Sequence, residues 1–559
     1  MKYLICEKLE KSVILFPVSQ DGKMINVRIL AAGVTVSEQT LRISKKAEMN
    51  AVFLIEDHKG EKIELEVFDG QETIEFPDIV SYVKLSDGPE GENNTNILSE
   101  YIRPGIHYTC RKGYMNDPNG LLCYKDTYHM FYQWNPYGVT PGNTHWGHCI
   151  SRDLVHWEEL PPAIEPDGED GCIFSGSGVI DHQNTSGLKN GEEAPILLFY
   201  TATGYRFPAM KYYRNNFDDF FWSSGTPYTK QCIAYSIDGG KTFMKYEKNP
   251  VLTQRTVLNR DPKVVWDQDN ECWIMILFLS GNQYQLFFSR NLLDWEDGQK
   301  IEMEDSAECP DLFCLPLDGQ QNNRKWVLWG APGNYQVGYF KDRRFISETG
   351  IVKSRILDHL KYGSRSPFGG YAAQTYSGTL KGRVIQTCFI TTCFFAAPFR
   401  SCMSLPVELE LASVHGQMRL KFLPPEELKS LRKKMWTVAD CNREGAMLDA
   451  FSEEIFEMDL KATLGEDARF VLNIRGTLLI YDRRNETLIT PKGSYRLSCG
   501  NNSLGLHIWV DRGSIELFSE DGLVYAILAG VWDAGNRDLA LIECRDASLS
   551  GHVWALETI

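Results

Sequence analysis

The chain of 559 residues has no surplus of positive charge, because 74 acidic residues outnumber 58 lysines and arginines and give a formal net charge of −16. A strongly acidic protein is repelled by phosphate backbones and by anionic lipid surfaces. The sequence also has no uninterrupted apolar run long enough to span a bilayer. Nucleic acid and membrane are therefore excluded as main partners, and a small neutral or polar molecule fits better.

A secretion signal and a disulfide framework are also missing from the sequence. In residues 1–18, Glu7, Lys8 and Glu10 interrupt any apolar core that a signal peptide would need. The 15 cysteines form no CxxC pair, and their number is odd. Such a set is typical of reduced thiols that are buried as small apolar groups. We therefore predict a cytoplasmic protein.

Helical periodicity is scarce, and strand-like alternation dominates, which predicts an all-β chain. Its length is too great for one ordinary core, so two or three domains are expected. Alternation is strong in residues 11–18 and 61–68, and the polar stretch 87–95 (DGPEGENNT) reads as a linker. Residues 1–98 are therefore predicted to form a small N-terminal all-β domain, which could serve sugar binding, oligomer contact or packing.

An internal repeat follows the linker. Residues 151–157 (SRDLVHW) recur as 289–295 (SRNLLDW), and 236–243 (SIDGGKTF) is a looser copy. An apolar or aromatic strand precedes each of them, at 128–132, 196–200 and 272–278. Repeated four-stranded units of this kind favour a β-propeller, whose inner strands run toward one shared axis.

The pattern changes near Leu423. Residues 424–432 (PPEELKSLR) predict a short helix, with proline near its start and glutamate in its first turn. Alternation then returns in residues 469–474 and 506–511, so a C-terminal β-sandwich is expected. The predicted boundaries are 1–98 for the N-terminal domain, 99–422 for the propeller, 423–435 for a helical linker and 436–559 for the sandwich.

Three short acidic motifs lie far apart in the predicted propeller: residues 116–120 (NDPNG), 260–262 (RDP) and 308–311 (ECPD). Proline, asparagine and glycine interrupt regular strand pairing and place each carboxylate in a loop or turn. In a ring of strands, such carboxylates can converge on one cleft. Two carboxylates that flank a glycosidic bond are the minimum equipment for glycoside hydrolysis.

From about Arg103 to the C-terminus, the chain resembles glycoside hydrolase family 32, the invertases, levanases and inulinases. The motifs follow one another in the family's order: 107–120 (HYTCRKGYMNDPNG), 128–136 (YHMFYQWNP), 145–148 (HWGH), 153–157 (DLVHW), 174–177 (FSGS), 260–262, 308–311, 402–406 (CMSLP) and 510–518 (VDRGSIELF). The resemblance implies a five-bladed propeller followed by a β-sandwich. It also implies β-fructofuranoside hydrolysis with retention, by an exo-acting enzyme.

By the same resemblance, Asp117 is the nucleophile, Glu308 the acid/base and Asp261 the stabiliser of the transition state. Each has an ordinary structural alternative: Asp117 caps its own turn, Glu308 belongs to an acidic surface run, and Asp261 forms an ion pair with Arg260. As a general acid, Glu308 has to hold a proton near neutral pH, so a pKa raised by burial or by a neighbouring carboxylate is expected.

The resemblance also suggests a set of substrate-binding residues: Asn116, Gln133, Trp146, Phe174, Ser175, Arg260 and Asp311. No metal and no cofactor are expected. His145 and His148 have no matching acidic or cysteine cluster, so packing or hydrogen bonding is their expected role.

The chain departs from the family at three aromatic positions. Tyr114, Pro141 and Cys388 stand where tryptophan is usual, so the substrate fit is expected to differ. In addition, nine aromatic residues crowd into the segment 205–228. That segment is either a self-packed loop or oligomer contact, or a sugar-stacking surface near the cleft. A homo-oligomer through this segment or through the N-terminal domain is left open.

The substrate predicted from these features is sucrose or a short fructo-oligosaccharide. Fructosyl transfer and sucrose 6-phosphate hydrolysis are the enzymatic alternatives. A non-catalytic sugar-binding propeller is the alternative from another class, although a pure binder need not keep Asp117, Asp261 and Glu308 together.

Overall fold

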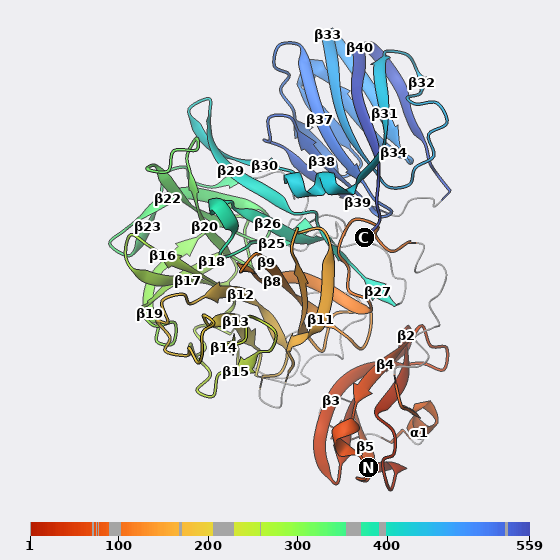
Figure 1. Ribbon diagram of the computed structural model, residues 1–559, viewed down its shortest axis with the longest axis vertical. Helices are drawn as coiled ribbons and strands as arrows, with labels where there is room; N and C mark the ends of the chain where they lie inside the picture. Colours follow the sequence, from red (N-terminus) through yellow and green to blue (C-terminus); the bar gives the residue numbers. More distant parts are fainter. Residues whose placement is uncertain are drawn as a thin grey trace.

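The computed structural model describes residues 2–69, 72–73, 75–76, 78–88, 102–166, 170–204, 228–257, 259–353, 370–390, 398–530 and 535–559. These residues form mainly β-strands, arranged in seven sheets. The N-terminal sheet lies at one end of the molecule and the C-terminal sheet at the other, with five sheets between them (Figure 1). Within the described ranges, no helix has the length and hydropathy that crossing a membrane requires.

The N-terminal sheet has seven strands, in which the long β2 pairs with β3, β4, β5 and β7. Its inward-facing aliphatic residues form a core of their own. A one-turn α1 (Ile79–Tyr82) and a 3₁₀ turn at Glu56–His58 complete it. The strands are β1 (Lys2–Cys6), β2 (Val13–Ala31), β3 (Val34–Ile43), β4 (Met49–Leu54), β5 (Ile63–Asp69), β6 (Glu72–Thr73) and β7 (Lys84–Ser86).

The five central sheets are antiparallel and follow one another along the chain, except that β27 adds in parallel to the edge of the first. The first contains β8 (Gly113–Tyr124), β9 (Thr127–Asn135), β10 (His145–Ser151), β11 (Trp157–Ile164) and β27 (Phe399–Arg400). The second contains β12 (Ile173–Ile180), β13 (Ile196–Ala202), β14 (Lys230–Ser236) and β15 (Met244–Lys245).

The third central sheet contains β16 (Arg260–Asp267), β17 (Cys272–Ser280), β18 (Gln283–Ser289) and β19 (Glu296–Glu302). The fourth contains β20 (Asp311–Pro316), β21 (Arg324–Trp329), β22 (Asn334–Lys341), β23 (Arg344–Ser347) and β24 (Val352–Lys353). The fifth contains β25 (Gly370–Thr375), β26 (Ile385–Ile390), β28 (Cys402–Met403), β29 (Val407–Val414) and β30 (Gln417–Leu423), with a 3₁₀ turn at Leu380–Gly382.

The first strands of the five sheets contact one another in a closed cycle: β8 with β12, β12 with β16, β16 with β20, β20 with β25, and β25 with β8. The sequence repeat occupies the turn between the third and fourth strands of the first three sheets. In the first and third sheets, Ser151 and Ser289 each accept a hydrogen bond from the amide two residues later, at 3.1 Å. The repeat is therefore a turn of the same form, which connects the third strand to the fourth in these sheets.

A 3₁₀ helix at Glu426–Leu431 lies where the sequence predicts a short helix, and the ten-stranded C-terminal sheet follows it. The long strands β33 and β40 pair along most of their length and give the sheet a sandwich-like form around one apolar core. A 3₁₀ turn occupies Arg483–Asn485. The strands are β31 (Arg432–Cys441), β32 (Gly445–Ala446), β33 (Phe456–Ile474), β34 (Thr477–Asp482), β35 (Thr487–Thr490), β36 (Gly493–Arg496), β37 (Ser503–Val510), β38 (Ser514–Ser519), β39 (Tyr525–Ala529) and β40 (Leu539–Leu556).

A buried ionic cluster joins the C-terminal sheet to the segment that precedes β8. His107 Nδ1 lies 2.7 Å from Asp511 Oδ2, and His107 Nε2 lies 2.9 Å from Glu516 Oε1. All three side chains have no exposed surface. Burial acts to lower the pKa of His107, but hydrogen bonds from the imidazole to both carboxylates outweigh it and raise that pKa to about 9. His107 is therefore a buried cation in the folded protein at neutral pH.

Candidate active site

The three acidic motifs meet at one end of the ring of first strands. Asp117 lies near the beginning of β8, Asp261 is the second residue of β16, and Glu308 lies just before β20. Ser175 near the start of β12 and Tyr371 near the start of β25 complete the set. Each of the five sheets thus supplies a side chain from the same end of its first strand.

Local irregularities in the backbone turn these side chains toward one another. The strand register shifts at residues 115–118 of β8, 174–176 of β12, 260–263 of β16 and 371–374 of β25. Such bulges re-aim side chains near the ends of strands. Asp261 and Glu308 have positive φ angles of 63° and 49°, which non-glycine residues adopt only at a cost in free energy. Strain of this kind clusters at functional sites.

The carboxylate of Asp117 is held by three donors. Ser175 Oγ donates to Asp117 Oδ2 at 2.6 Å, and the Cys309 thiol lies 3.3 Å from the same oxygen. The amide of Asn116 donates to Asp117 Oδ1 at 3.3 Å. Burial raises the pKa of Asp117, and the charge of Glu308 adds to the rise, while the three hydrogen bonds act against it. Oδ1 is the oxygen that carries fewer contacts.

The side chain of Gln133 connects two of these donors, Asn116 and Ser175. Its side-chain oxygen accepts a hydrogen bond from Asn116 at 2.5 Å, and its amide donates to Ser175 Oγ at 2.6 Å. Asn116, Gln133 and Ser175 were predicted as substrate-binding residues, and the structure brings all three to Asp117. Ser175 and Gln133 are buried, whereas Asn116 is partly exposed. Ser175 therefore orients Asp117 directly, and Gln133 does so through Ser175 and Asn116.

Asp261 is linked to both other carboxylates. Its Oδ2 accepts a hydrogen bond from the backbone amide of Cys309 at 3.1 Å and lies 3.6 Å from Arg260 Nε. Burial raises the pKa of Asp261 to about 7; the charge of Arg260 opposes the rise, and those of Glu308 and Asp117 add to it. The charges of the three carboxyl groups therefore affect one another's pKa.

Glu308 differs from the expectation drawn from the sequence. Arg260 Nη2 donates to its Oε1 at 2.5 Å, and the hydroxyl of Tyr371 donates to its Oε2 at 2.5 Å. Burial acts to raise the pKa of Glu308, but the charge of Arg260 and these two hydrogen bonds outweigh it and hold that pKa below its usual value. The predicted rise was wrong for the unliganded site, because Arg260 and Tyr371 stabilise the charged form of Glu308.

Two predicted substrate-binding residues are enclosed by the protein instead. Trp146 is fully buried in an apolar core and donates from Nε1 to the carbonyl oxygen of Phe174 at 3.1 Å. Asp311 has no exposed surface, and its Oδ1 lies 2.9 Å from Lys263 Nζ. The backbone amide of Thr375 donates to Asp311 Oδ2 at 2.6 Å. Both side chains are held by other groups of the protein, whereas Phe174 remains partly exposed.

The three altered aromatic positions have different surroundings. Tyr114 is buried beneath the guanidinium of Arg400, which lies 5.4 Å from its ring centre. Cys388 is buried in the apolar core that faces the C-terminal sheet. Pro141 lines a pocket beside the N-terminal sheet. Only this last change therefore falls on a surface that a ligand can reach.

His145 and His148, for which the sequence predicts no role as metal ligands, make other contacts. His145 Nδ1 lies 2.5 Å from the carbonyl oxygen of Asn143, and His148 Nε2 lies 3.1 Å from His129 Nδ1. Burial lowers the pKa of His145 to about 4. In the part of the chain that the structure describes, no group of three His, Cys, Asp or Glu side chains is arranged to hold a metal ion. The aromatic segment 205–228 lies outside the described residues except for Tyr228.

Comparison with known proteins adds independent evidence. The sequence model of the "Glycosyl hydrolases family 32 N-terminal domain" matches residues 107–422. A levanase from Bacillus subtilis is 33% identical over 480 residues, which cover 77% of this chain and 66% of that protein. An invertase from Schizosaccharomyces pombe is 38% identical over 294 residues, which cover 48% of this chain and 47% of that protein. The match thus spans about half to two thirds of these relatives.

Solved structures agree with the sequence relatives. The exo-inulinase of Aspergillus awamori superposes with a TM-score of 0.68 at 25% identity and covers 82% of this chain and 98% of its own. The β-fructofuranosidase of Schwanniomyces occidentalis, complexed with fructosyl-erythritol, superposes with a TM-score of 0.67 at 26% identity and covers the same shares.

Proposed function

This chain belongs to glycosyl hydrolase family 32, and from that membership we propose that it is a retaining, exo-acting β-fructofuranosidase. The proposed substrates are sucrose and short fructo-oligosaccharides, from which it releases terminal fructose. One observation carries the proposal: Asp117, Asp261 and Glu308 are tied into one cluster by Cys309 and Arg260 at a common end of the five first strands.

The proposed architecture is a five-bladed β-propeller at 99–422, followed by a short linker at 423–435 and a β-sandwich at 436–559. The closed cycle of contacts among the five first strands supports the propeller. Residues 1–98 form the extra N-terminal domain in this proposal. The cytoplasmic location predicted from the sequence is part of this proposal.

In the proposed first step, the protonated form of Glu308 gives a proton to the glycosidic oxygen as the bond to the anomeric carbon breaks. Asp117 Oδ1 attacks that carbon and forms a fructosyl ester, while Asp261 accepts hydrogen bonds from sugar hydroxyls that tighten in the transition state. In the second step, water gives a proton to Glu308 and attacks the same carbon. Fructose leaves with retained configuration, and the Asp117 carboxylate is restored.

The direct test is fructose release by the purified protein from sucrose, 1-kestose, inulobiose, levanbiose and sucrose 6-phosphate. We expect release from sucrose and 1-kestose, because a terminal fructofuranosyl unit is all that the proposed cluster requires. The product profile at high substrate separates hydrolysis from fructosyl transfer, since transfer yields longer oligosaccharides. A lack of release from all five would contradict the proposal.

Replacing Tyr371 by phenylalanine is expected to move the alkaline limb of the profile of kcat/KM against pH to higher pH. That limb reports the loss of the proton from the general acid in the free enzyme. The lost phenol stabilises the charged form of Glu308, so its removal raises the pKa of that group. Tyr284→Phe is the matched control, because Tyr284 lies 3.5 Å from the backbone oxygen of Glu308 and not at its carboxylate. An unmoved limb in Tyr371→Phe would remove Glu308 from the acid role.

A further inference from the structure

The loop between β9 and β10 lies at the same end of the first central sheet as Asp117. Strand β9 ends at Asn135, which pairs with Tyr114, three residues before Asp117 on β8. Because β8 bulges between Met115 and Pro118, the distance is better counted along β9, where about 3.3 Å per residue places that pair roughly 7–10 Å from the level of the proposed nucleophile. Residues 136–144 therefore extend outward from the rim of the candidate active site.

The N-terminal sheet is attached to this loop by specific contacts. The side chain of Asn143 accepts a hydrogen bond from the backbone amide of Thr40 at 3.0 Å and donates to its carbonyl oxygen at 2.9 Å. The ring of Tyr137 stacks on Phe53, with centres 4.6 Å apart and planes 13° apart. Tyr137 also packs against the apolar core of the sheet. The loop is thus held in place by the N-terminal sheet.

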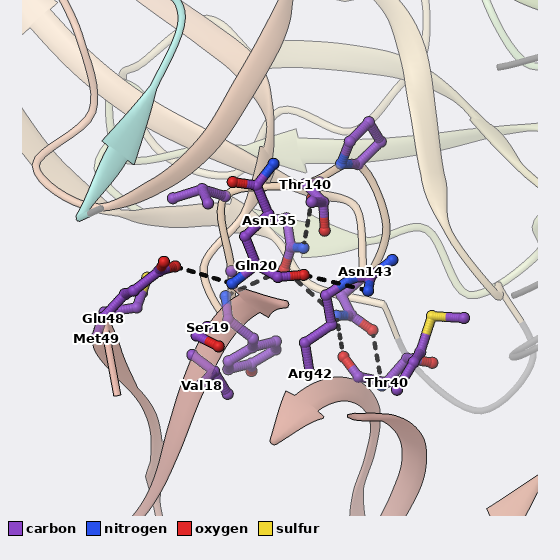
Figure 2. A pocket seen from close by; sticks show the side chains of 15 residues that line it. Val18, Ser19, Gln20, Thr40, Arg42, Glu48, Met49, Asn135, Thr140 and Asn143 are labelled. Atoms are coloured by element: carbon purple, nitrogen blue, oxygen red, sulfur yellow. Dashed lines mark hydrogen bonds between the residues drawn. The ribbon is translucent and has the colours of Figure 1, made fainter. Parts of the chain in front are cut away.

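A shallow pocket that is open to solvent lies between the loop and the sheet (Figure 2). Its walls combine apolar surfaces, such as Met49 and Pro141, with hydrogen-bonding side chains that include Gln20, Arg42 and Glu48. Glu48 accepts a hydrogen bond from the backbone amide of Gln20 at 2.8 Å. Arg42 is the one cation among the described residues that line the pocket, and Glu48 offsets its charge.

We propose that this pocket binds the part of an oligosaccharide substrate that lies beyond the first leaving sugar. The proposal rests on the proposed fructosidase function. The pocket begins roughly 7–10 Å from the level of the nucleophile, which is more than the width of one sugar ring, so it is too distant to hold the fructose that is cleaved. Walls of mixed polarity with balanced charge suit a neutral, hydroxyl-rich ligand better than a phosphate. The N-terminal domain then forms part of the substrate-binding surface.

Pro141 gives this arrangement a physical reason. Pro141 lines the shared pocket, and proline has no aromatic ring. The ring of Tyr137, the aromatic side chain of this loop, is already stacked on Phe53, so the loop offers less stacking surface to a sugar. The N-terminal sheet supplies the opposing wall. Selectivity for longer substrates therefore depends on both the loop and the sheet.

Filling the pocket tests the proposal. Gly138 lines it, and a Cβ at that residue would meet only Asn135 Nδ2, at 3.9 Å, so Gly138→Phe places a ring there without a backbone clash. We expect kcat/KM for the trisaccharide 1-kestose, divided by that for sucrose, to fall about tenfold, mostly through KM. Gly88→Phe is the matched control: it lies on the N-terminal domain outside the pocket, and its Cβ would meet no atom within 4 Å.

Two outcomes would overturn the proposal: an unchanged ratio, including the case in which both substrates lose equally, or the same change of ratio in Gly88→Phe. If the wild-type protein hydrolyses no fructoside, the proposed function fails, and the pocket is tested separately by calorimetric binding of 1-kestose. Binding that is present in the wild type and weakened about tenfold in Gly138→Phe would support the pocket. Equal binding by both proteins, or none by the wild type, would contradict it.

Discussion

Replacing Asp117 by asparagine is expected to lower kcat for sucrose on the order of 10⁴-fold, as the loss of a catalytic carboxylate does in other hydrolases. Asparagine has nearly the same shape, so Ser175 and Cys309 keep a partner at this position. What is lost is the negative oxygen that forms the ester. The measurement is initial-rate kinetics on the purified variant, with circular dichroism to show that the fold is retained.

Asp126→Asn provides a matched control for this change. Asp126 lies in the exposed turn at the other end of the same hairpin, with a φ of 61° that asparagine tolerates. We expect its rate to stay close to that of the wild type. If Asp117→Asn keeps kcat within tenfold of the wild type, the carboxylate is only a cap of its own turn, and the proposed nucleophile is wrong.

The second large effect concerns stability at the junction with the C-terminal sheet. His107→Leu is expected to lower the free energy of unfolding by about 3–5 kcal/mol, because it leaves two buried carboxylates without their cation. The measurement is the thermal midpoint of unfolding at neutral pH. His156→Leu is the control, since His156 forms an exposed pair with Asp153 that is worth about 1 kcal/mol or less.

The same cluster predicts how the stability of the wild-type protein depends on pH. The pKa of His107 is about 9 in the folded protein and 6.5 in its ordinary state. The resulting stabilisation, about 3 kcal/mol, is fully present below pH 6.5 and is lost as the pH rises through 9. The thermal midpoint should therefore fall between these two values in the wild type and much less in His107→Leu. Parallel curves for the two proteins would show that His107 is not a buried cation.

Much of the fold was predictable because its signals are local. The turn motif at 151–157 and 289–295 recurs with the same serine contacts, and the apolar strands that precede it are the second strands of their sheets. The register of the long N-terminal strand β2, which pairs with four neighbours, had no such signal. Long-range pairing depends on side-chain packing that a local pattern does not encode.

At the candidate site, the sequence predicted which carboxylates meet but not what surrounds them. Tyr371 carries no motif of its own, yet it and Arg260 set the direction of the pKa shift of Glu308. The cysteines were predicted only as buried apolar groups, although the sulfur of Cys309 lies 3.3 Å from Asp117 Oδ2 and 3.6 Å from Asp261 Oδ2. Trp146 and Asp311 belong to matching motifs, but burial gives them a supporting position. Motif resemblance identifies positions in the chain, whereas side-chain exposure depends on the whole ring of strands.

The most direct test of the double-displacement mechanism is to trap its covalent intermediate. In Glu308→Gln, a fructosyl fluoride can still react, because fluoride leaves without a proton, but the second step lacks its base. We expect mass spectrometry of the acid-quenched, digested protein to find one added fructosyl unit on the peptide that contains Asp117. A label on another carboxylate, or unlabelled protein that releases fructose of inverted configuration, would contradict the mechanism.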